Sequence, residues 1–146
     1  MSKAIFVAIK RFDPSLPLPR YQTAGSVGLD LCARLTSTIP AKTVVRVPLN
    51  IALQLPIGTW ALLAARSSLY KKGLMMANGI GVGDSDYRGN NDEYQAALFN
   101  MTDADVTIEK GERIVQLIVM TYDRVELTEQ TTFDAPDRGG FGTTGK

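Results

Sequence analysis

Apolar positions along the chain fall in short runs rich in Val, Ile and Leu. Gly and Pro separate these runs at intervals near the roughly 8–12 residues typical of β-sandwiches and barrels. Helical character is confined to residues 67–72, where Ser67 or Ser68 is expected to cap a short turn that Gly73 ends. The runs predict β-strands at residues 5–9, 43–47, 60–64, 94–99 and 114–121. The pattern therefore predicts an all-β protein with at most one short helix.

Length and charge exclude several classes of protein. A chain of 146 residues fits one domain with one hydrophobic core. Lys and Arg number 16 and Asp and Glu 15, a net charge of +1, so neither nucleic acid nor a membrane is expected as a partner. The longest mostly apolar stretch, residues 51–65, is interrupted by polar and turn-forming residues and is shorter than the roughly 20 residues of a membrane span. The N-terminus has neither a signal-peptide core nor an Arg-rich transit pattern, which predicts an intracellular, cytoplasmic protein.

The absence of histidine restricts the possible chemistry. The sequence contains no His and a single cysteine, Cys32. Intrachain disulfides, Cys/His zinc sites and imidazole bases are therefore excluded, and a catalytic base is expected to be a carboxylate. Cys32 has no basic neighbour in sequence that would activate its thiol, so it is expected to be a small buried residue.

The densest polar cluster spans residues 81–89, where Asp84 and Asp86 lie close to Tyr87 and an arginine. In a strand, the two carboxylates would point to the same face and could act together. The alternative is a solvated acidic turn of a hairpin. The cluster alone does not decide between these interpretations.

Three further segments have both a structural and a functional interpretation. Residues 65–68 either form a simple serine-capped turn or bind an anion through main-chain N–H groups, hydroxyls and Arg66. Residues 111–116 lead into a strand in which Gln116 needs hydrogen-bond partners, structural or ligand. Residues 24–31 form a turn and a strand, with Asp30 either at the surface or on a ligand.

The C-terminal segment differs in composition from the rest. Residues 134–146 are Gly-rich and contain little that could pack into a core, so we expect a β domain at 1–133 followed by a tail at 134–146. Such a tail either frays or folds over a ligand. Its main-chain N–H groups and Arg138 are suited to binding a phosphate.

Taken together and in order, residues 24–31, 66–68, 81–89, 111–118 and 138–145 resemble the five motifs of the trimeric dUTP diphosphatases, the dUTPases. The resemblance covers most of the chain. It implies a distorted jelly-roll-like β-barrel or sandwich in a homotrimer. Active sites would then lie at subunit interfaces, with the tail exchanged so that it closes over another subunit's site.

The resemblance also implies a reaction and a role for each residue. Water attacks the α-phosphorus of dUTP, giving dUMP and pyrophosphate, which keeps uracil out of DNA and supplies dUMP for dTMP synthesis. Asp84 corresponds to the acid that activates this water, and Tyr87 to the ring that packs on deoxyribose and excludes a 2′-hydroxyl. Asn78 corresponds to a residue that binds uracil, together with main-chain groups of Gly81, Val82 and Gly83.

The triphosphate is assigned to other segments by the same resemblance. Ser67 lies near the leaving oxygen and Gln116 near the α-phosphate, while Arg66 and Ser68 also bind phosphate. In the tail, Phe141 stacks on uracil. Mg²⁺ is expected, held mainly by phosphate oxygens and water, with Asp30 reaching it only through water. The β- and γ-phosphates are held by Arg138, Gly142 and Thr143.

The chain departs from the family pattern at three places. Gly83 replaces the usual Ile before the catalytic Asp, which is expected to loosen the hairpin. Residues 90–95 contain about three additional residues, which predicts a longer turn or bulge. The interval from Arg138 to Phe141 is about two residues shorter than in the family pattern, which shortens the distance the chain can span between them by up to roughly 7 Å. Two alternatives remain open: a dCTP deaminase or bifunctional deaminase-diphosphatase of the same fold, and a regulatory protein that uses dUTP as a switch ligand and binds a partner protein.

Overall fold

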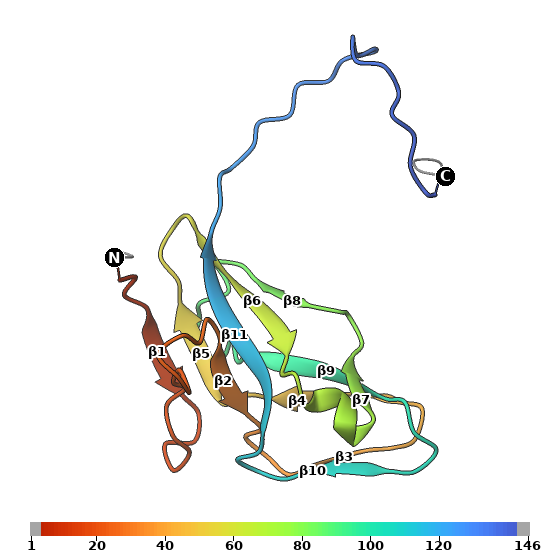
Figure 1. The fold of residues 1–146 in the computed structure, drawn as a ribbon. Helices are drawn as coiled ribbons and strands as arrows, with labels where there is room; N and C mark the ends of the chain where they lie inside the picture. The colour runs from red at the N-terminus through yellow and green to blue at the C-terminus, as the bar shows by residue number, and fades with distance from the viewer. Residues whose placement is uncertain (1–3, 143–146) are drawn as a thin grey trace.

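The computed structural model describes residues 4–142, and within them the chain is almost entirely β-structure (Figure 1). One 3₁₀ turn, η1 (Leu69–Lys72), interrupts the strands. The strands are β1 (Ala8–Arg11), β2 (Leu29–Cys32), β3 (Ser37–Ile39), β4 (Val44–Pro48), β5 (Ile51–Gln54), β6 (Thr59–Ala65), β7 (Leu74–Met76), β8 (Gly81–Gly83), β9 (Gln95–Asn100), β10 (Val106–Ile108) and β11 (Arg113–Thr121).

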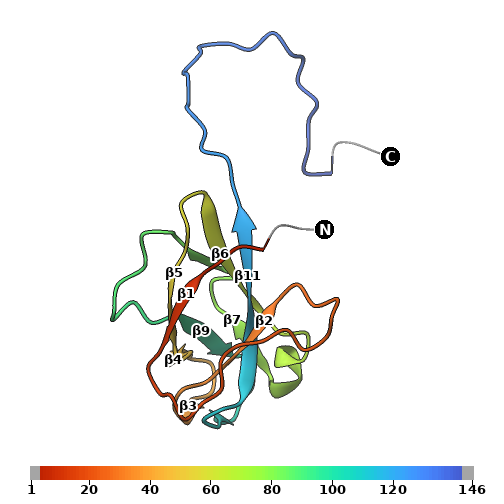
Figure 2. The same cartoon turned by 90° about the vertical axis from the view of Figure 1, so that its left-hand side faces the viewer.

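The strands form antiparallel sheets that share one core. A four-stranded sheet has the order β2-β11-β6-β8, a three-stranded sheet has the order β4-β9-β7, and β1-β5 and β3-β10 form two ribbons. β11 and β6 pair continuously from Val115–Ala65 to Thr121–Thr59, and Figure 2 shows β11 running through the body beside β6. Side chains from both larger sheets belong to a single buried cluster. This two-layer arrangement confirms the predicted all-β fold.

The alternation of side chains along the strands explains the layers. In β6, Ala61 and Leu63 are buried while Leu62 and Ala64 are only partly covered. In β9, Ala96 and Leu98 are buried in the same way. Successive side chains leave a strand on opposite faces, so each strand directs one set into the core.

The predicted strands are all present, with small shifts, except at the N-terminus. β1 begins at Ala8 rather than Ile5, and the side chains of Ile5 and Phe6 are exposed. Gly73 ends η1 with a left-handed φ of 73°, as predicted. The predicted serine cap is wrong: Ser68 occupies the N-cap position, but its side chain makes no capping hydrogen bond.

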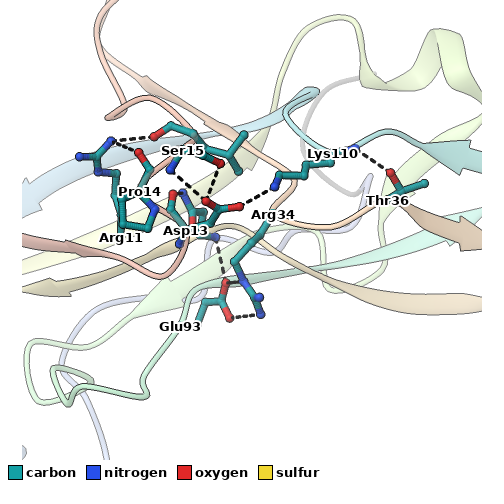
Figure 3. Close-up of polar contacts among 10 residues, drawn as sticks. Arg11, Asp13, Pro14, Ser15, Arg34, Thr36, Glu93 and Lys110 are labelled. Carbon is teal, nitrogen blue, oxygen red and sulfur yellow. Dashed lines mark hydrogen bonds and ion pairs between the residues drawn. The ribbon is translucent and has the colours of Figure 1, made fainter.

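A polar network ties the coil before β9 to the rest of the body (Figure 3). Glu93 accepts hydrogen bonds from Arg34 Nε at 2.6 Å and Arg34 Nη2 at 3.0 Å, and from the main-chain N–H of Asn50 at 3.0 Å. The buried amide of Asn50 in turn bonds the main chain of Asp13, whose carboxylate is 2.5 Å from Lys110 Nζ. The Glu93 carboxylate is thereby fixed by three hydrogen bonds from two residues.

Beyond β11 the described chain contains no further strand. Figures 1 and 2 both show residues 122–142 leaving the β body as an extended segment. Large apolar side chains in this segment, including Leu127 and Phe133, are exposed. Across residues 4–142, no helix is long and apolar enough to cross a membrane.

Candidate active site

A cleft of about 310 Å³ opens beside β8 and brings together predicted site residues from separate segments. We call it the β8 pocket. Arg46, Leu63, Glu93, Tyr94 and Gln95 complete its wall. The predicted residues that line it are Asn78, Gly81, Val82, Gly83, Asp84 and Tyr87.

Asp84 lies at the point where β8 ends and a turn begins. The main-chain N–H of Tyr87 donates to the carbonyl of Asp84 at 3.2 Å and closes this turn. Asp84 and Asp86 are therefore not on one strand face, and the strand interpretation of the acidic pair is wrong. The Asp84 carboxylate is exposed at the pocket, where water can reach it.

Tyr87 is held by two contacts that orient its ring. Its hydroxyl donates to the main-chain carbonyl of Glu93 at 2.8 Å. Its ring meets that of Tyr94 edge to face, with centroids 5.6 Å apart and planes at 78°. Burial, followed by the charges of Asp92 and Glu93, raises the pKa of Tyr87, so the phenol stays neutral.

Gly83 has a packing role that the sequence did not reveal. An ideal Cβ at this position would lie 2.4 Å from Tyr94 Oη and 2.8 Å from Tyr94 Cε1. The phenol ring of Tyr94 therefore occupies the space in which a side chain of residue 83 would project. The sequence predicted that Gly83 loosens the hairpin. In the structure, the ring of Tyr94, from the coil before β9, fills the space beside Gly83 at the end of β8.

A second group of predicted residues gathers around the carboxylate of Asp30 on β2. Asp30 Oδ2 lies 3.1 Å from Arg66 Nε and 3.1 Å from Arg113 Nη1. Arg66 also donates from Nη1 to the carbonyl of Arg113 at 3.1 Å. Only 10% of the Asp30 side chain is exposed, so the surface interpretation of Asp30 is wrong. Ser67 and Ser68 follow Arg66 and are exposed.

Gln116 joins this group from the central strand β11, where it is paired with Asp30. Its Nε2 donates to the carbonyl of Ala65 at 3.1 Å. An ideal Cβ on Gly28 would lie 2.4 Å from Gln116 Oε1, so the Gln116 amide lies in the space that a side chain at residue 28 would enter. We call Asp30, Arg66, Arg113 and Gln116, with Ser67 and Ser68, the Asp30 cluster.

Comparison with known proteins identifies the family. A family model described as dUTPase matches residues 15–145. The chain belongs to the dUTPase family. A relative from Corynebacterium diphtheriae, named deoxyuridine 5'-triphosphate nucleotidohydrolase, is 40% identical over 98% of this chain and 95% of its own length. A relative of the same name from Avian adenovirus 8 is 36% identical over 93% and 82% of the two chains.

Solved dUTPases share the fold. The dUTPase from Streptococcus mutans superposes with a TM-score of 0.74 at 32% identity, covering 81% of this chain and 98% of its own. The Staphylococcus bacteriophage 80alpha dUTPase with dUPNHPP has a TM-score of 0.84 over 96% and 98% of the two chains. At 21% identity, this second likeness concerns the fold alone.

The predicted tail residues lie apart from both groups. Arg138 and Phe141 belong to the segment that extends from the body in Figure 2, and neither lines the β8 pocket. Phe141 and Gly142 are exposed, with φ values of 53° and 85°. Thr143 lies outside the described residues. Within the single chain, the described part of the tail, residues 134–142, therefore lines neither group.

The donors present fit a magnesium ion held mainly by a ligand. Within residues 4–142, no three Cys, Asp or Glu side chains gather to hold a metal ion. Both arginines contact Asp30 through Oδ2, so Oδ1 would be the oxygen to accept a hydrogen bond from a water of such an ion. Mg²⁺ prefers oxygen ligands and retains several waters, so this donor set suits it. Cys32 is half-buried, and burial raises the pKa of its thiol.

Sequence reasoning missed residues that complete the two groups. The sequence places Arg113 only in a turn that leads into a strand, whereas in the structure it flanks Asp30 in the β2–β11 ladder. Nothing in the sequence marked Tyr94 or Glu93 as a site residue. Tyr94 begins the apolar run at residues 94–99, and Glu93 lies in the segment at residues 90–95 that is longer than in the family pattern. Both residues line the β8 pocket only because the coil before β9 folds back beside β8.

Proposed function

We propose that this protein hydrolyses dUTP to dUMP and pyrophosphate, with the β8 pocket binding the nucleoside and the Asp30 cluster binding phosphate. The observation that carries the proposal is the convergence of an amide, a tyrosine ring and an exposed carboxylate in one pocket of a dUTPase-family chain. Each of these groups suits one part of deoxyuridine triphosphate.

Uracil is bound by Asn78 and by the main chain of β8. An amide side chain offers both donors and an acceptor, as the edge of uracil requires. β8 is the edge strand of its sheet in the order β2-β11-β6-β8, so its outer N–H and C=O groups are not used by a neighbouring strand. Tyr87, fixed through Glu93, packs on deoxyribose and leaves no room for a 2′-hydroxyl.

Asp84 is the general base that activates the attacking water. The chain has no histidine, and the exposed Asp84 carboxylate stands at the pocket. Positioned acid–base groups of this kind typically contribute about 10²–10⁴-fold to the rate. No covalent intermediate with the protein is required.

Phosphate is bound by Arg66, Ser67, Ser68 and Gln116. Asp30 holds the Arg66 guanidinium through Nε, which fixes the direction of its remaining N–H groups. Arg113 adds a second positive charge at the same place. Mg²⁺, when bound, would neutralise part of the charge of the phosphates, and Asp30 would accept a hydrogen bond from one of its waters.

The active site is shared between subunits of a homotrimer. Gly83 is paired with Ala61, and Asp84 continues from there toward the beginning of β6. Ser67 lies beyond the other end of β6, so roughly 20 Å of strand separates Asp84 from Ser67 in one chain. Asp84 activates the water that attacks the α-phosphorus, and Ser67 contacts the leaving oxygen bonded to that phosphorus. Groups this far apart in one chain cannot both reach that bond. This separation supports a site built from the β8 pocket of one subunit and the Asp30 cluster of another.

The tail completes the site in this proposal. Residues 134–146 of one subunit close over a site of the trimer, with Phe141 stacking on uracil and Arg138, Gly142 and Thr143 holding the β- and γ-phosphates. The extended course of the described part of this segment, away from its own body, supports a role on another subunit. Exposed Phe141 would gain a covered position there.

Hydrolysis in ¹⁸O-labelled water tests the position of attack. Attack on the α-phosphorus places the label in dUMP and leaves pyrophosphate unlabelled. Mass spectrometry of both products distinguishes the alternatives, because attack on the β-phosphorus would label pyrophosphate. Label in pyrophosphate would contradict the proposed mechanism.

A further inference from the structure

Two tyrosines touch in the wall of the β8 pocket, and their hydroxyl groups differ in one respect. The hydroxyl of Tyr87 donates to the carbonyl of Glu93. The hydroxyl of Tyr94 has no hydrogen-bond partner, and it is the one buried side-chain polar atom in this condition among residues 4–142. A buried polar group without a partner is unfavourable, so this hydroxyl calls for an explanation.

The position of Tyr94 is fixed by its main chain. Its N–H donates to the carbonyl of Ile51 at 2.9 Å, and its carbonyl accepts from the N–H of Leu49 at 2.9 Å. The side chain is 5% exposed and lies against Gly83. Packing alone explains the ring, because the ring fills the space beside glycine. Packing does not explain the hydroxyl, since phenylalanine would fill the same space without burying a polar atom.

The hydroxyl is able to donate. Burial, followed by the charges of Tyr87 and Asp84, raises the pKa of Tyr94 to about 12. The phenol therefore keeps its proton at neutral pH. It faces the side of β8 from which a residue-83 side chain would project, and Tyr94 lines the pocket together with Asn78 and Tyr87. Asp84 lies in the turn after β8, and its exposed carboxylate makes no hydrogen bond with the Tyr94 hydroxyl.

We propose that the Tyr94 hydroxyl donates a hydrogen bond to an oxygen atom of the nucleoside part of the bound nucleotide. This inference rests on the proposed function of the β8 pocket. The acceptor is a keto oxygen of the pyrimidine or a hydroxyl oxygen of the sugar. The ring meanwhile takes the place of the side chain that Gly83 lacks.

The test is the variant Tyr94→Phe, which keeps the ring and removes the hydroxyl. Calorimetric titration with the α,β-imido analogue of dUTP should show binding about 2- to 12-fold weaker than in the wild type, the worth of one hydrogen bond between uncharged groups. The thermal midpoint of the free variant should equal or exceed that of the wild type, since no partner is lost. Tyr87→Phe is the matched control for this stability measurement: it removes a partnered hydroxyl and should lower the midpoint.

The 2′,3′-dideoxy form of the same imido analogue separates the two acceptors. If the sugar hydroxyl is the acceptor, wild type and Tyr94→Phe bind the dideoxy analogue equally; if a keto oxygen is the acceptor, the difference persists. Equal binding of the full analogue by wild type and Tyr94→Phe would overturn the inference, as would a lower midpoint of the free variant. Failure of the wild type to bind the analogue would instead refute the proposed function, and the inference with it.

Discussion

The hydroxyl of Tyr87 donates a 2.8 Å hydrogen bond to the main-chain carbonyl of Glu93. The carboxylate of the same glutamate accepts two hydrogen bonds from Arg34 and one from Asn50. The ring proposed to recognise deoxyribose is thus connected to the polar network of Figure 3 through one residue. Structural stability and nucleotide binding should therefore change together at Glu93.

Replacing Glu93 with Gln tests this connection. The change removes the charge that pairs with Arg34 and should destabilise the protein by about 2–4 kcal/mol, because it leaves a partly covered guanidinium without its carboxylate. The KM for dUTP should rise, because the main-chain carbonyl of residue 93, which accepts the Tyr87 hydrogen bond, is held less firmly once the side chain loses its ion pair. Chemical denaturation and steady-state kinetics measure the two effects. Glu126→Gln, at an exposed position in the C-terminal segment, is the control and should change neither.

Replacing Asp84 with Asn tests the assignment of the base. The amide preserves size and polarity but cannot accept a proton from water, so kcat should fall by about 10²–10⁴-fold. Binding of the imido analogue should be nearly unchanged. Asp86→Asn, two residues away in the same turn, is the matched control and should retain most of the activity. Near-normal turnover in Asp84→Asn would show that another group activates the water.

Replacing Asp30 with Asn tests the support of Arg66. The variant loses the charge that holds both Arg66 and Arg113 at 3.1 Å. Pyrophosphate and the imido analogue should both bind more weakly, whereas deoxyuridine should bind as it does to the wild type. Calorimetry with the three ligands provides the measurement. An equal loss for deoxyuridine would mean that the change disturbs the fold rather than the phosphate site.

The pH dependence of stability should include a contribution from Asp13. Hydrogen bonds from Lys110 and Ser15 hold the pKa of this carboxyl well below its ordinary value of 3.8. A lowered pKa in the folded state stabilises the protein fully above the ordinary value, and this stabilisation is lost as the pH falls below it. Thermal midpoints of wild type and Asp13→Asn should differ at pH 6 and converge on acidification below about pH 4. A difference that stays constant down to pH 2 would contradict this.

The sequence predicted best the strands whose own apolar pattern is long enough to indicate a strand without knowledge of the pairing partners. β6 and β11 are long and apolar, so local pattern was sufficient. β3, β8 and β10 have three residues each and exist because distant segments pair with them, which a local pattern does not reveal. The N-terminal prediction began too early because an apolar run also occurs where the chain remains exposed.

The candidate site shows the same limit. Asp84 and Tyr87 were predicted because they share one motif. Tyr94 was missed because its role depends on the absence of a side chain at Gly83, which is a relation between strand β8 and the coil before β9. The burial of Asp30 was missed for a similar reason, since its partners come from the ends of two other strands.

Pyrophosphate release is the measurement that tests the central claim most directly. Purified protein with Mg²⁺ is offered dUTP, dTTP, dCTP and UTP in parallel, and ammonia is measured in the dCTP reaction. The account predicts rapid release from dUTP, with the 5-methyl group of dTTP and the 2′-hydroxyl of UTP both excluded, and no ammonia from dCTP. Ammonia release from dCTP would favour a deaminase of the same fold. Binding of dUTP without any release would contradict the account and favour a regulatory protein for which dUTP is a switch ligand.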